Sequence, residues 1–262
     1  MRDSVGPART ALRAALRSPL VVLSVTAVLL AGYQALRLAA GPRLFPAIPA
    51  VARRLGQLIG NGVLLAHAAA SARRVLFGLG LSVLVAVPAA GLLARFPRLD
   101  RFASPLLYLA YPVPKIVFLP VLMLLLGLGD ASKVAVIFLI VVFQAIVSLR
   151  DAFRGLDRRA FQAVRAFGGG KLDLLRHVVV PASLPSLLSA IRLSGGTAIA
   201  VLFMAESFAS EDGMGFFVMD AWSRVAYADL HCGVLALAAL GLALFVLVDL
   251  AERCLCPWLK PG

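Results

Sequence analysis

Cysteine, histidine and acidic residues are scarce in this chain of 262 residues. It has only three cysteines, three histidines and 13 Asp and Glu residues. The cysteines, Cys232, Cys254 and Cys256, form no CxxC pair and are odd in number, so no disulfide framework is indicated. The histidines are scattered, which leaves the cysteines without partners for a metal site. We interpret the cysteines as free thiols in a reducing compartment and expect no bound metal.

Motifs of the common catalytic sites are also missing. Lys171 follows three glycines, but Leu172 comes next and the first glycine of a phosphate-binding loop would fall on Arg165. The chain has no GxSxG and no HExxH sequence. An embedded enzyme needs a polar constellation within its spans, and these spans hold almost no polar groups. We therefore predict that the chain is not an enzyme, has no catalytic residue and carries no cofactor of its own.

Long apolar blocks dominate what is present. Hydrophobic residues make up 61% of the chain and charged residues only 15%. A helix needs about 20 apolar residues to cross a hydrocarbon core of about 30 Å. The first block is longer than the apolar region of a signal peptide, so we interpret it as a membrane helix. The sequence predicts an all-α polytopic membrane protein with six spans, in residues 19–36, 75–94, 102–128, 131–149, 184–206 and 232–248.

The distribution of basic residues predicts the orientation. Lys and Arg number 26, and a cytoplasmic amino terminus places 16 of them in inner segments and eight in outer segments. This asymmetry follows the positive-inside rule, so both termini are predicted to be cytoplasmic. No basic stripe alternates with aromatic residues, so we interpret the excess charge as contact with anionic membrane lipid and expect no nucleic-acid partner.

Four segments between or within the blocks carry further expectations. Residues 41–71 predict an amphipathic helix on the outer surface. Prolines interrupt the third block around Lys115, which predicts a broken helix. Asp130 is placed to cap the fourth span. Residues 207–231, with glycines and aromatic residues, predict an interfacial or re-entrant segment.

A polar segment, residues 150–185, separates the fourth and fifth blocks and is predicted to project from the membrane. Three apolar residues lie three positions apart, as on one helical face: Phe161, Val164 and Phe167. Three glycines, residues 168–170, then favour a break. A second short helix is expected, stopped by Pro181 and Pro185. A helix–break–helix with an apolar stripe and basic flanks indicates a docking element.

This segment resembles the EAA loop of ABC-importer permease subunits, the inner membrane components of binding-protein-dependent transport systems. It is most similar to the branch that takes up nitrate, sulfonates and taurine. The motif residues are Gln162, Ala163, Val164, Gly168, Pro181 and Pro185. Gln162 departs from the pattern, because the family usually has a glutamate there. The resemblance covers the chain from about Ala66 to its end.

The resemblance implies a type I ABC importer permease fold in the bacterial inner membrane, divided into residues 1–65 and a core of residues 66–262. The first part would comprise a basic leader, the first span and the outer segment. The implied partners are a second copy of the permease, two ATPase subunits that bind ATP and an extracytoplasmic solute-binding protein. The implied cargo is a small anion such as a sulfonate, taurine or nitrate. The implied ATPase-coupling residues are Phe161, Gln162, Ala163, Val164, Arg165, Phe167 and Gly168.

Ionisable residues within the predicted spans are few. A charged side chain at the bilayer centre costs at least about 2.5–3.5 kcal/mol, so it seldom faces lipid. Lys115 and Glu206 are therefore candidates for the substrate path. A structural role for Lys115, holding the broken helix or pairing with Glu206, is an equal alternative. Arg192 is expected to extend towards the cytoplasmic interface.

Residues 206–229 concentrate negative charge at the predicted outer mouth. Five carboxylates stand there against one base, Arg224. Such a mouth would repel anions. Two hypotheses follow: the carboxylates dock basic residues of the binding protein, or the substrate is not an anion.

Two other classes of function remain as alternatives. An ion-coupled secondary transporter predicts an inverted internal repeat and carboxylates at the membrane midplane. The sequence shows no clear repeat, and its central blocks lack such carboxylates. A membrane scaffold without transport activity would leave the docking segment unexplained unless its partner is not an ATPase.

Overall fold

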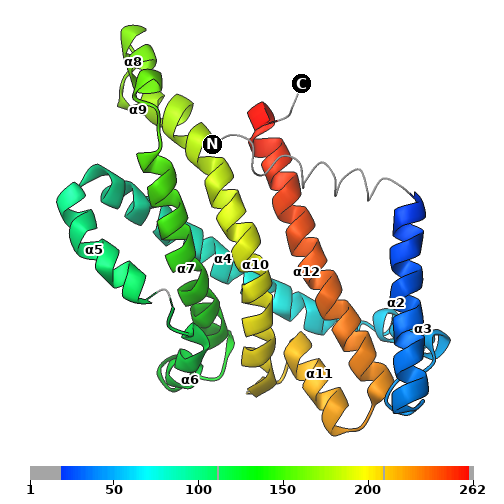
Figure 1. The fold of residues 1–262 in the computed structure, drawn as a ribbon. Coiled ribbons are helices and arrows are strands. Elements are labelled where there is room, and N and C mark those ends of the chain that lie inside the picture. The colour runs from blue at the N-terminus through cyan, green and yellow to red at the C-terminus, as the bar shows by residue number, and fades with distance from the viewer. Residues whose placement is uncertain (1–18, 111, 209, 260–262) are drawn as a thin grey trace.

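The computed structural model describes residues 19–110, 112–208 and 210–259, and every regular element within these ranges is a helix. The basic leader, residues 1–18, lies outside the described residues. Four long helices form the bundle in Figure 1. They are α4 (Val63–Arg95), α7 (Asp130–Arg154), α10 (Val180–Phe208) and α12 (Tyr227–Leu255). Helix α7 packs against both α4 and α10, and α10 also contacts α12.

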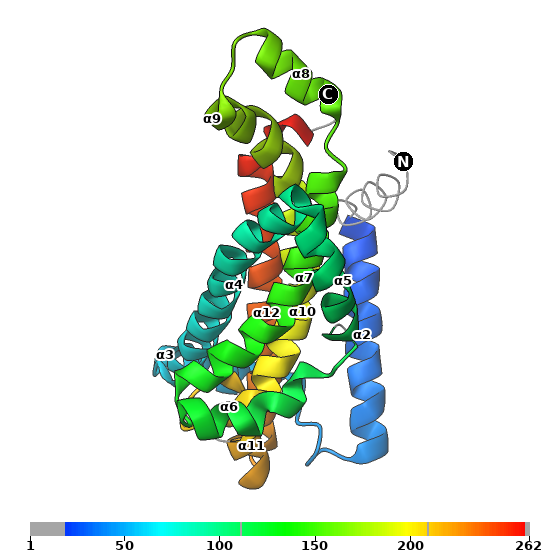
Figure 2. The same ribbon diagram turned by 90° about the vertical axis from the view of Figure 1, so that its left-hand side faces the viewer.

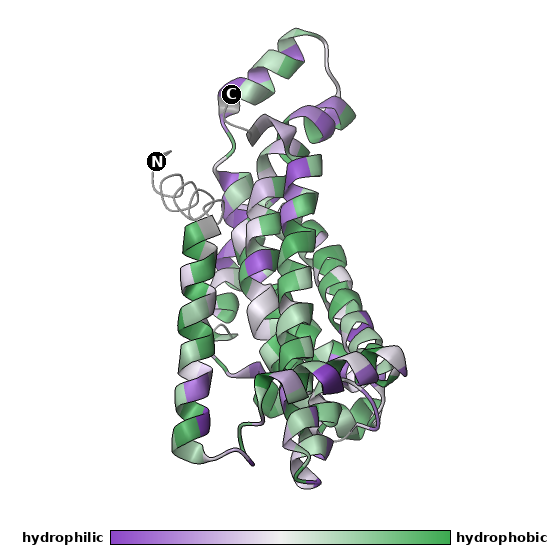
Figure 3. Ribbon diagram, turned by 90° about the vertical axis from the view of Figure 1, so that its right-hand side faces the viewer, coloured by the Kyte–Doolittle hydropathy of each residue, from purple (hydrophilic) through white to green (hydrophobic). Residues whose placement is uncertain are grey.

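Five helices in the described ranges are long and apolar enough to cross a membrane, and a bent pair makes a sixth candidate. The fifth long helix is α2 (Pro19–Ala40). The bent pair comprises α5 (Pro97–Ala110) and the stretch formed by η1 (Lys115–Phe118) and α6 (Leu119–Leu126), at an angle of 86°. Figure 3 shows hydrophobic residues along the long helices. The predicted all-α, six-span fold is thus confirmed. Apolar segments in lipid form helices because their backbone N–H and C=O groups must be satisfied internally.

The core lies between α4, α7 and α10, where the helices approach closely. Gly78 of α4 faces Ile137 of α7, and a Cβ at Gly78 would lie 2.5 Å from the Cγ2 atom of Ile137. Ala198 and Leu202 of α10 complete this buried cluster. A small residue at the contact allows the backbones to approach, as is common between membrane helices. The cluster holds together the helices on either side of the polar segment.

Helix α2 stands at the edge of the bundle in Figures 1 and 2. No residue of its candidate span is buried. Tyr33 is its anchor: the hydroxyl donates to the Pro46 carbonyl at 2.8 Å, and the ring meets Phe45 and His231 edge-on. This attachment lies in the last third of the helix, whereas Ser24, near its start, only donates to the Val21 carbonyl of the same helix at 2.9 Å.

The second span begins earlier than predicted. The expected amphipathic helix is present as α3 (Ile48–Gly60), but α4 already starts at Val63, and the predicted start at residue 75 is wrong. Two arginines, Arg73 and Arg74, made that stretch look too polar. Both form ion pairs with Asp130, so the helix carries them with their charges compensated.

Asp130 does not cap α7 as predicted. Gly129 occupies the N-cap position, and no side chain forms a capping hydrogen bond there. The carboxylate of Asp130 binds Arg73 and Arg74 instead. A bond to two guanidinium groups satisfies the carboxylate better than one backbone N–H would.

The polar segment projects from the bundle at the end shown by α8 and α9 in Figures 1 and 2. It consists of α8 (Arg158–Ala166), α9 (Lys171–Leu174) and a π-helical turn, η2 (Leu175–Val179). The predicted stop at Pro181 and Pro185 is wrong, because the chain continues as helix into α10 and contains Pro185 within it. The wide π turn directly precedes Pro181, where the altered hydrogen-bond pattern tolerates a residue without an N–H.

The segment after α10 contains a helix. It is α11 (Met214–Ser223), which packs against α10 and α12 at the end of the bundle opposite to α8. The last element is η3 (Pro257–Leu259). All three cysteines are free thiols, as expected. Burial, together with the nearby Glu252 carboxylate, raises the pKa of the Cys256 thiol, which keeps it protonated and unreactive.

Candidate functional site

The glycine break after α8 is a well-formed helix terminator. Asp157 caps the start of α8, because its side chain accepts from the Arg159 N–H at 2.9 Å. At the other end Gly168 has φ +80°, and its N–H donates to the Arg165 carbonyl at 2.9 Å. The Gly169 N–H donates to the Val164 carbonyl at 2.9 Å. These two bonds define a Schellman motif, which reverses the chain at a residue with positive φ.

The predicted coupling residues divide between the inside and the outside of this turn. Phe161 and Val164 are half-buried, and Val164 packs against the glycine break, where a Cβ at Gly169 would lie 2.5 Å from its Cγ1 atom. Phe167 is 93% exposed. The remaining residues are exposed on the surface of the loop: Gln162, Ala163, Arg165 and Gly168. The predicted single apolar face is therefore split, with Phe167 alone directed outward.

A second exposed apolar residue lies across the turn. Leu172 of α9 is 75% exposed, and Leu175 also has an exposed side chain. The same loop carries Arg165 and Lys171, both exposed. We call this set, Phe167, Leu172, Leu175, Arg165 and Lys171, the loop surface.

Ion pairs tie α7 to α5 where α7 enters the loop. Arg154 and Arg150 both pair with the buried carboxylate of Asp100, the latter at 3.6 Å. The Arg150 Nη1 group also donates to the Ser104 hydroxyl at 2.9 Å. We call Asp100, Ser104, Arg150 and Arg154 the α5–α7 clamp. A displacement of the loop that moves the end of α7 must therefore also move α5.

A similar arrangement ties α10 to α12 at Arg192, 12 residues after the start of α10. Arg192 donates to Asp249 at 2.6 Å and to Glu252, and its guanidinium lies over the Phe245 ring, 5.4 Å from the centroid. The expectation for Arg192 is correct in direction, because these partners lie towards the end of α12 on the side of the loop. The expected surroundings are wrong, since the Arg192 guanidinium pairs with two carboxylates of the protein and not with the membrane interface.

Arg74 forms the centre of a buried charge network at the opposite end of the bundle. Its side chain is only 3% exposed. The Nη1 group donates to Glu206 at 2.6 Å, the Nε group to Asp130 at 2.7 Å, and the Nη2 group to Asp212. Lys133 lies beside this network and donates to the carbonyls of residues 128 and 129 at 2.6 and 3.3 Å. The Arg74 network joins α4, α7, α10 and the start of α11.

Glu206 is fully enclosed within the Arg74 network. Its carboxylate also accepts from the Ser71 hydroxyl at 2.8 and 2.9 Å and from the Gly215 N–H at 2.9 Å. Gly213, with φ +104°, has no room for a side chain, because a Cβ there would lie 2.3 Å from this carboxylate. Glu206 therefore holds the Gly-x-Gly turn at the start of α11 in place. The ion pair that it forms is with Arg74, and the predicted pairing with Lys115 is not what holds it.

The predicted negative outer mouth is largely neutralised. Arg54 of α3 pairs with Asp229, and Arg224 pairs with Asp220. Glu206 and Asp212 both bind Arg74. Glu211 is the remaining carboxylate of the five and has no ion pair within the described residues. It lines a cavity of about 770 Å³ together with Arg74, Asp130, Lys133 and Asp212. The expectation of repulsion counted bases only within the segment, whereas Arg54 and Arg74 come from outside it.

Lys115 lies at the break between α5 and α6, as predicted. Its Nζ group donates to the Ala110 carbonyl at 2.6 Å and lies 5.4 Å from the centroid of the Phe143 ring. The side chain lines a cavity of about 340 Å³ between the broken helix, α7 and α10. Lys115 and Glu206 therefore belong to separate sites, one at the helix break and one inside the Arg74 network.

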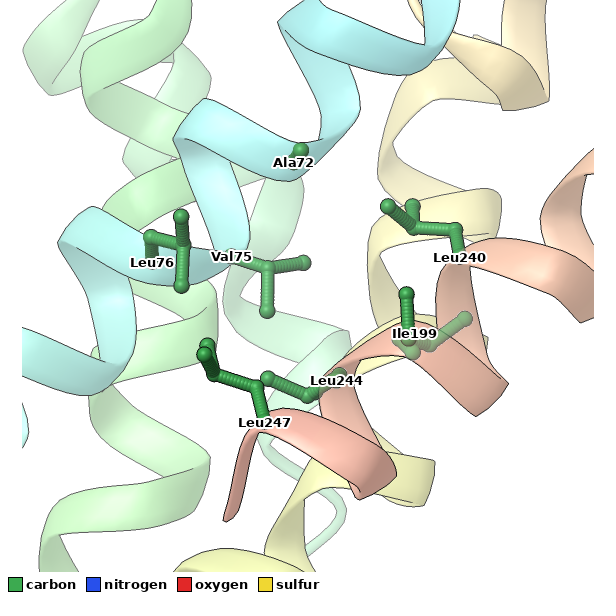
Figure 4. Close-up of a pocket in the computed structure, with 8 residues that line it drawn as sticks. Ala72, Val75, Leu76, Ile199, Leu240, Leu244 and Leu247 are labelled. Atoms are coloured by element: carbon green, nitrogen blue, oxygen red, sulfur yellow. The ribbon is translucent and has the colours of Figure 1, made fainter. Parts of the chain in front are cut away.

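An aliphatic groove of about 230 Å³ lies between α4, α10 and α12. Figure 4 shows Val75, Leu76, Leu240, Ile199 and Leu244 directed towards it. All eight lining side chains are aliphatic, so the groove offers no donor, acceptor or charge to an ionic solute. It is suited to an acyl chain or to another apolar helix face.

Fold and site together define a polytopic membrane protein with a polar helical segment that projects from one end of its helix bundle. Residues 78–261 match the family model described as "Binding-protein-dependent transport system inner membrane component". The chain belongs to this family. The sequence-based assignment to ABC-importer permeases is thus confirmed.

Relatives and solved structures agree with the family. The chain is 27% identical to the taurine transport system permease protein TauC of Escherichia coli over 192 residues, 73% of this chain and 70% of the relative. It is 30% identical to the putative aliphatic sulfonates transport permease protein SsuC of Bacillus subtilis over 207 residues, which are 77% of this chain and 73% of the relative. A structure of the inward-facing MetNI methionine ABC transporter shares the fold, with a TM-score of 0.60 and 16% sequence identity. The match covers 73% of this chain and 95% of the transporter chain.

Sequence reasoning missed Arg74, whose guanidinium binds three carboxylates. From the sequence, the basic pair at residues 73 and 74 falls in the outer segment before the predicted span of residues 75–94, because charge adjacent to an apolar block usually marks the end of that block. The available signal was the excess of carboxylates in residues 206–229. So many acidic groups beside one base predict that bases come from elsewhere in the chain.

Proposed function

We propose that this permease forms half of a homodimeric pore and is driven by an ATPase docked on the loop surface. Hydrolysis of ATP would take place on that partner, and the loop would transmit its movement to the spans. An extracytoplasmic solute-binding protein would deliver the cargo at the end that holds the Arg74 network. Residues 66–262 would be the transport core and residues 1–65 a peripheral part.

The exposure of Phe167 is the observation that carries this proposal. Phe167 directly follows α8 and Leu172 belongs to α9, both in the segment that projects from the bundle in Figure 1, and both side chains are exposed. Apolar residues exposed together on one structured loop, as Phe167, Leu172 and Leu175 are, favour a protein contact. Gln162, exposed on α8, offers an amide where the family usually has a carboxylate, so this contact does not depend on an ion pair at that position.

The α5–α7 clamp supports a role of the loop as a lever. Helix α7 enters the loop and α10 leaves it, and both are tied to a further helix by buried or half-buried ion pairs. A rigid displacement of α8 would reach α5 through Asp100 and α12 through Arg192. Lys115 begins η1, the element that follows α5 after the break.

Co-purification tests the docking proposal. We expect a co-expressed ATPase subunit to be retained in detergent by the wild-type permease and to be lost or much reduced with Phe167→Ala. Phe77→Ala is the matched control, because Phe77 is 65% exposed but lies within the span of α4. Retention of the ATPase by Phe167→Ala at the wild-type level would contradict docking through the loop surface.

The cargo is proposed to be a small anion of the sulfonate class. Two of the relatives carry taurine and aliphatic sulfonates in their names. Neutralisation of the carboxylates at the outer mouth removes the electrostatic objection to an anionic substrate.

We propose that both termini and the loop surface face the cytoplasm. The prediction is that a cysteine introduced by Gly60→Cys reacts with an impermeant thiol reagent from outside intact cells, whereas one introduced by Arg98→Cys does not. Both positions are exposed, and the native thiols are first replaced. Labelling of the Arg98→Cys variant from outside would overturn the orientation and with it the position of the ATPase.

A further inference from the structure

We propose that the cavity at the helix break is an anion-binding subsite of the translocation path, built from Lys115, Gln144 and Thr197. We call it the Lys115 pocket. The ligand class is a small oxyanion with a short apolar tail, such as an alkyl sulfonate. This inference rests on the proposed transport function and adds the residues that recognise the cargo.

The Lys115 pocket lies at mid-depth in the bundle. Gln144 is 14 residues from the start of α7 and 10 from its end, which places it about 21 and 15 Å from the two ends at 1.5 Å per residue. Thr197 is 11 residues before the end of α10, or about 17 Å. A cation held at this depth beside an interrupted helix is tolerated where protein or water covers it, and it marks a solute path.

The charge of the pocket is positive. Its lining comprises Lys115 as the single ionisable side chain among the described residues, with prolines, aliphatic residues, Phe143, Gln144 and Thr197. None of these lining residues is an Asp or a Glu. The Lys115 ammonium has three N–H donors, and the Ala110 carbonyl at 2.6 Å fixes its direction without changing its charge. An anion entering the cavity would meet the Lys115 ammonium in a lining that includes no Asp or Glu among the described residues.

Polar groups on the facing helices supply further donors. The Ser194 hydroxyl donates to the Oε1 atom of Gln144, which fixes the amide with its Nε2 group as the remaining donor. Within the described residues the Gln144 Nε2 group donates no hydrogen bond. Thr197, one helical turn further along α10, adds a hydroxyl to the lining. An ammonium, an amide and a hydroxyl from three elements match the three oxygens of a sulfonate.

The apolar part of the lining sets the rest of the specificity. Val113, Ile116, Ile140 and Val201 face the same cavity, whose volume of about 340 Å³ is at the small end of ligand sites. These residues suit a short alkyl chain. The absence of a carboxylate from the described lining means that a cationic group on the cargo finds no partner here. The pocket therefore favours a simple alkyl sulfonate over a zwitterion.

Charge-selective labelling tests the Lys115 pocket. Thr197→Cys is made in the full chain with the three native cysteines replaced, and the purified permease is treated with two thiosulfonate reagents. One carries an ethylsulfonate group and the other an ethyltrimethylammonium group. With rates normalised to a free thiol in solution, we expect about tenfold faster reaction with the anionic reagent, equivalent to about 1.4 kcal/mol. Ethanesulfonate at millimolar concentration should protect the cysteine.

Two substitutions identify the source of the selectivity. Lys115→Gln should abolish the preference and the protection, whereas Lys115→Arg should retain both because the charge remains. Ala243→Cys, in the aliphatic groove, should react slowly with both reagents, since that groove offers no polar path.

The outcomes separate this inference from the proposed function. Equal normalised rates for the two reagents at the Thr197→Cys position, or an unchanged preference in Lys115→Gln, would overturn the anion subsite even if the ATPase is retained. Charge selectivity without retention of an ATPase would support the subsite and contradict docking on the loop surface.

Discussion

Gly168→Pro is expected to abolish uptake and the stimulation of ATP hydrolysis by the binding protein, while the permease remains in the membrane. Gly168 has φ +80°, whereas proline requires φ near −65°. The substitution also removes the N–H that donates to Arg165 at 2.9 Å. Both changes destroy the Schellman motif, so Phe167 can no longer be presented at the turn. Uptake and ATP hydrolysis are measured with the complete transporter in proteoliposomes.

The matched control is Gly168→Asn, because asparagine adopts positive φ more readily than other residues with a side chain. A Cβ at Gly168 has no atom within 4 Å, so only the backbone conformation is tested. We expect uptake by Gly168→Asn within about twofold of the wild type. Normal transport by Gly168→Pro would show that the turn is not the coupling lever.

Arg74→Met is expected to destabilise the permease strongly. Removing one partner of a buried ion pair costs about 3–5 kcal/mol, because the other charge remains without compensation. Here Glu206 would stay enclosed, and Asp212 would lose its partner as well. We expect a markedly lower unfolding temperature in detergent and a loss of monodisperse protein on gel filtration.

Arg73→Met is the control for this network. Arg73 is the neighbouring residue and binds the same Asp130, but its side chain is 55% exposed. An exposed ion pair contributes no more than about 1 kcal/mol, so its loss should barely change the unfolding temperature. The double variant Arg74→Met with Glu206→Gln should recover part of the lost stability, because it removes the uncompensated charge. Equal stability of Arg73→Met and Arg74→Met would contradict a buried network.

The difference between these two arginines shows how burial decides the role of a charge. They are adjacent in the sequence and share a partner, yet only Arg74 is directed into the junction of α4, α7 and α10. A rotation of about 100° around the helix axis separates an exposed arginine from the central residue of the Arg74 network. No pattern of residue types in the segment distinguishes them.

The amino-acid sequence by itself determined the membrane-spanning helical architecture and the position of the polar loop. Apolar blocks leave the chain no alternative to helices in lipid, and three consecutive glycines after α8 favour the reversal that Gly168 makes. Both features depend on local composition.

Only the tertiary structure decided which charges are paired. Arg54 with Asp229, Arg74 with Glu206 and Arg192 with Asp249 join residues that are 175, 132 and 57 positions apart. The same holds for the Lys115 pocket, where Gln144 and Thr197 belong to helices on opposite sides of the loop. The physical reason is that compensation of a charge depends on distance and burial in three dimensions, and the order of residues along the chain does not record either.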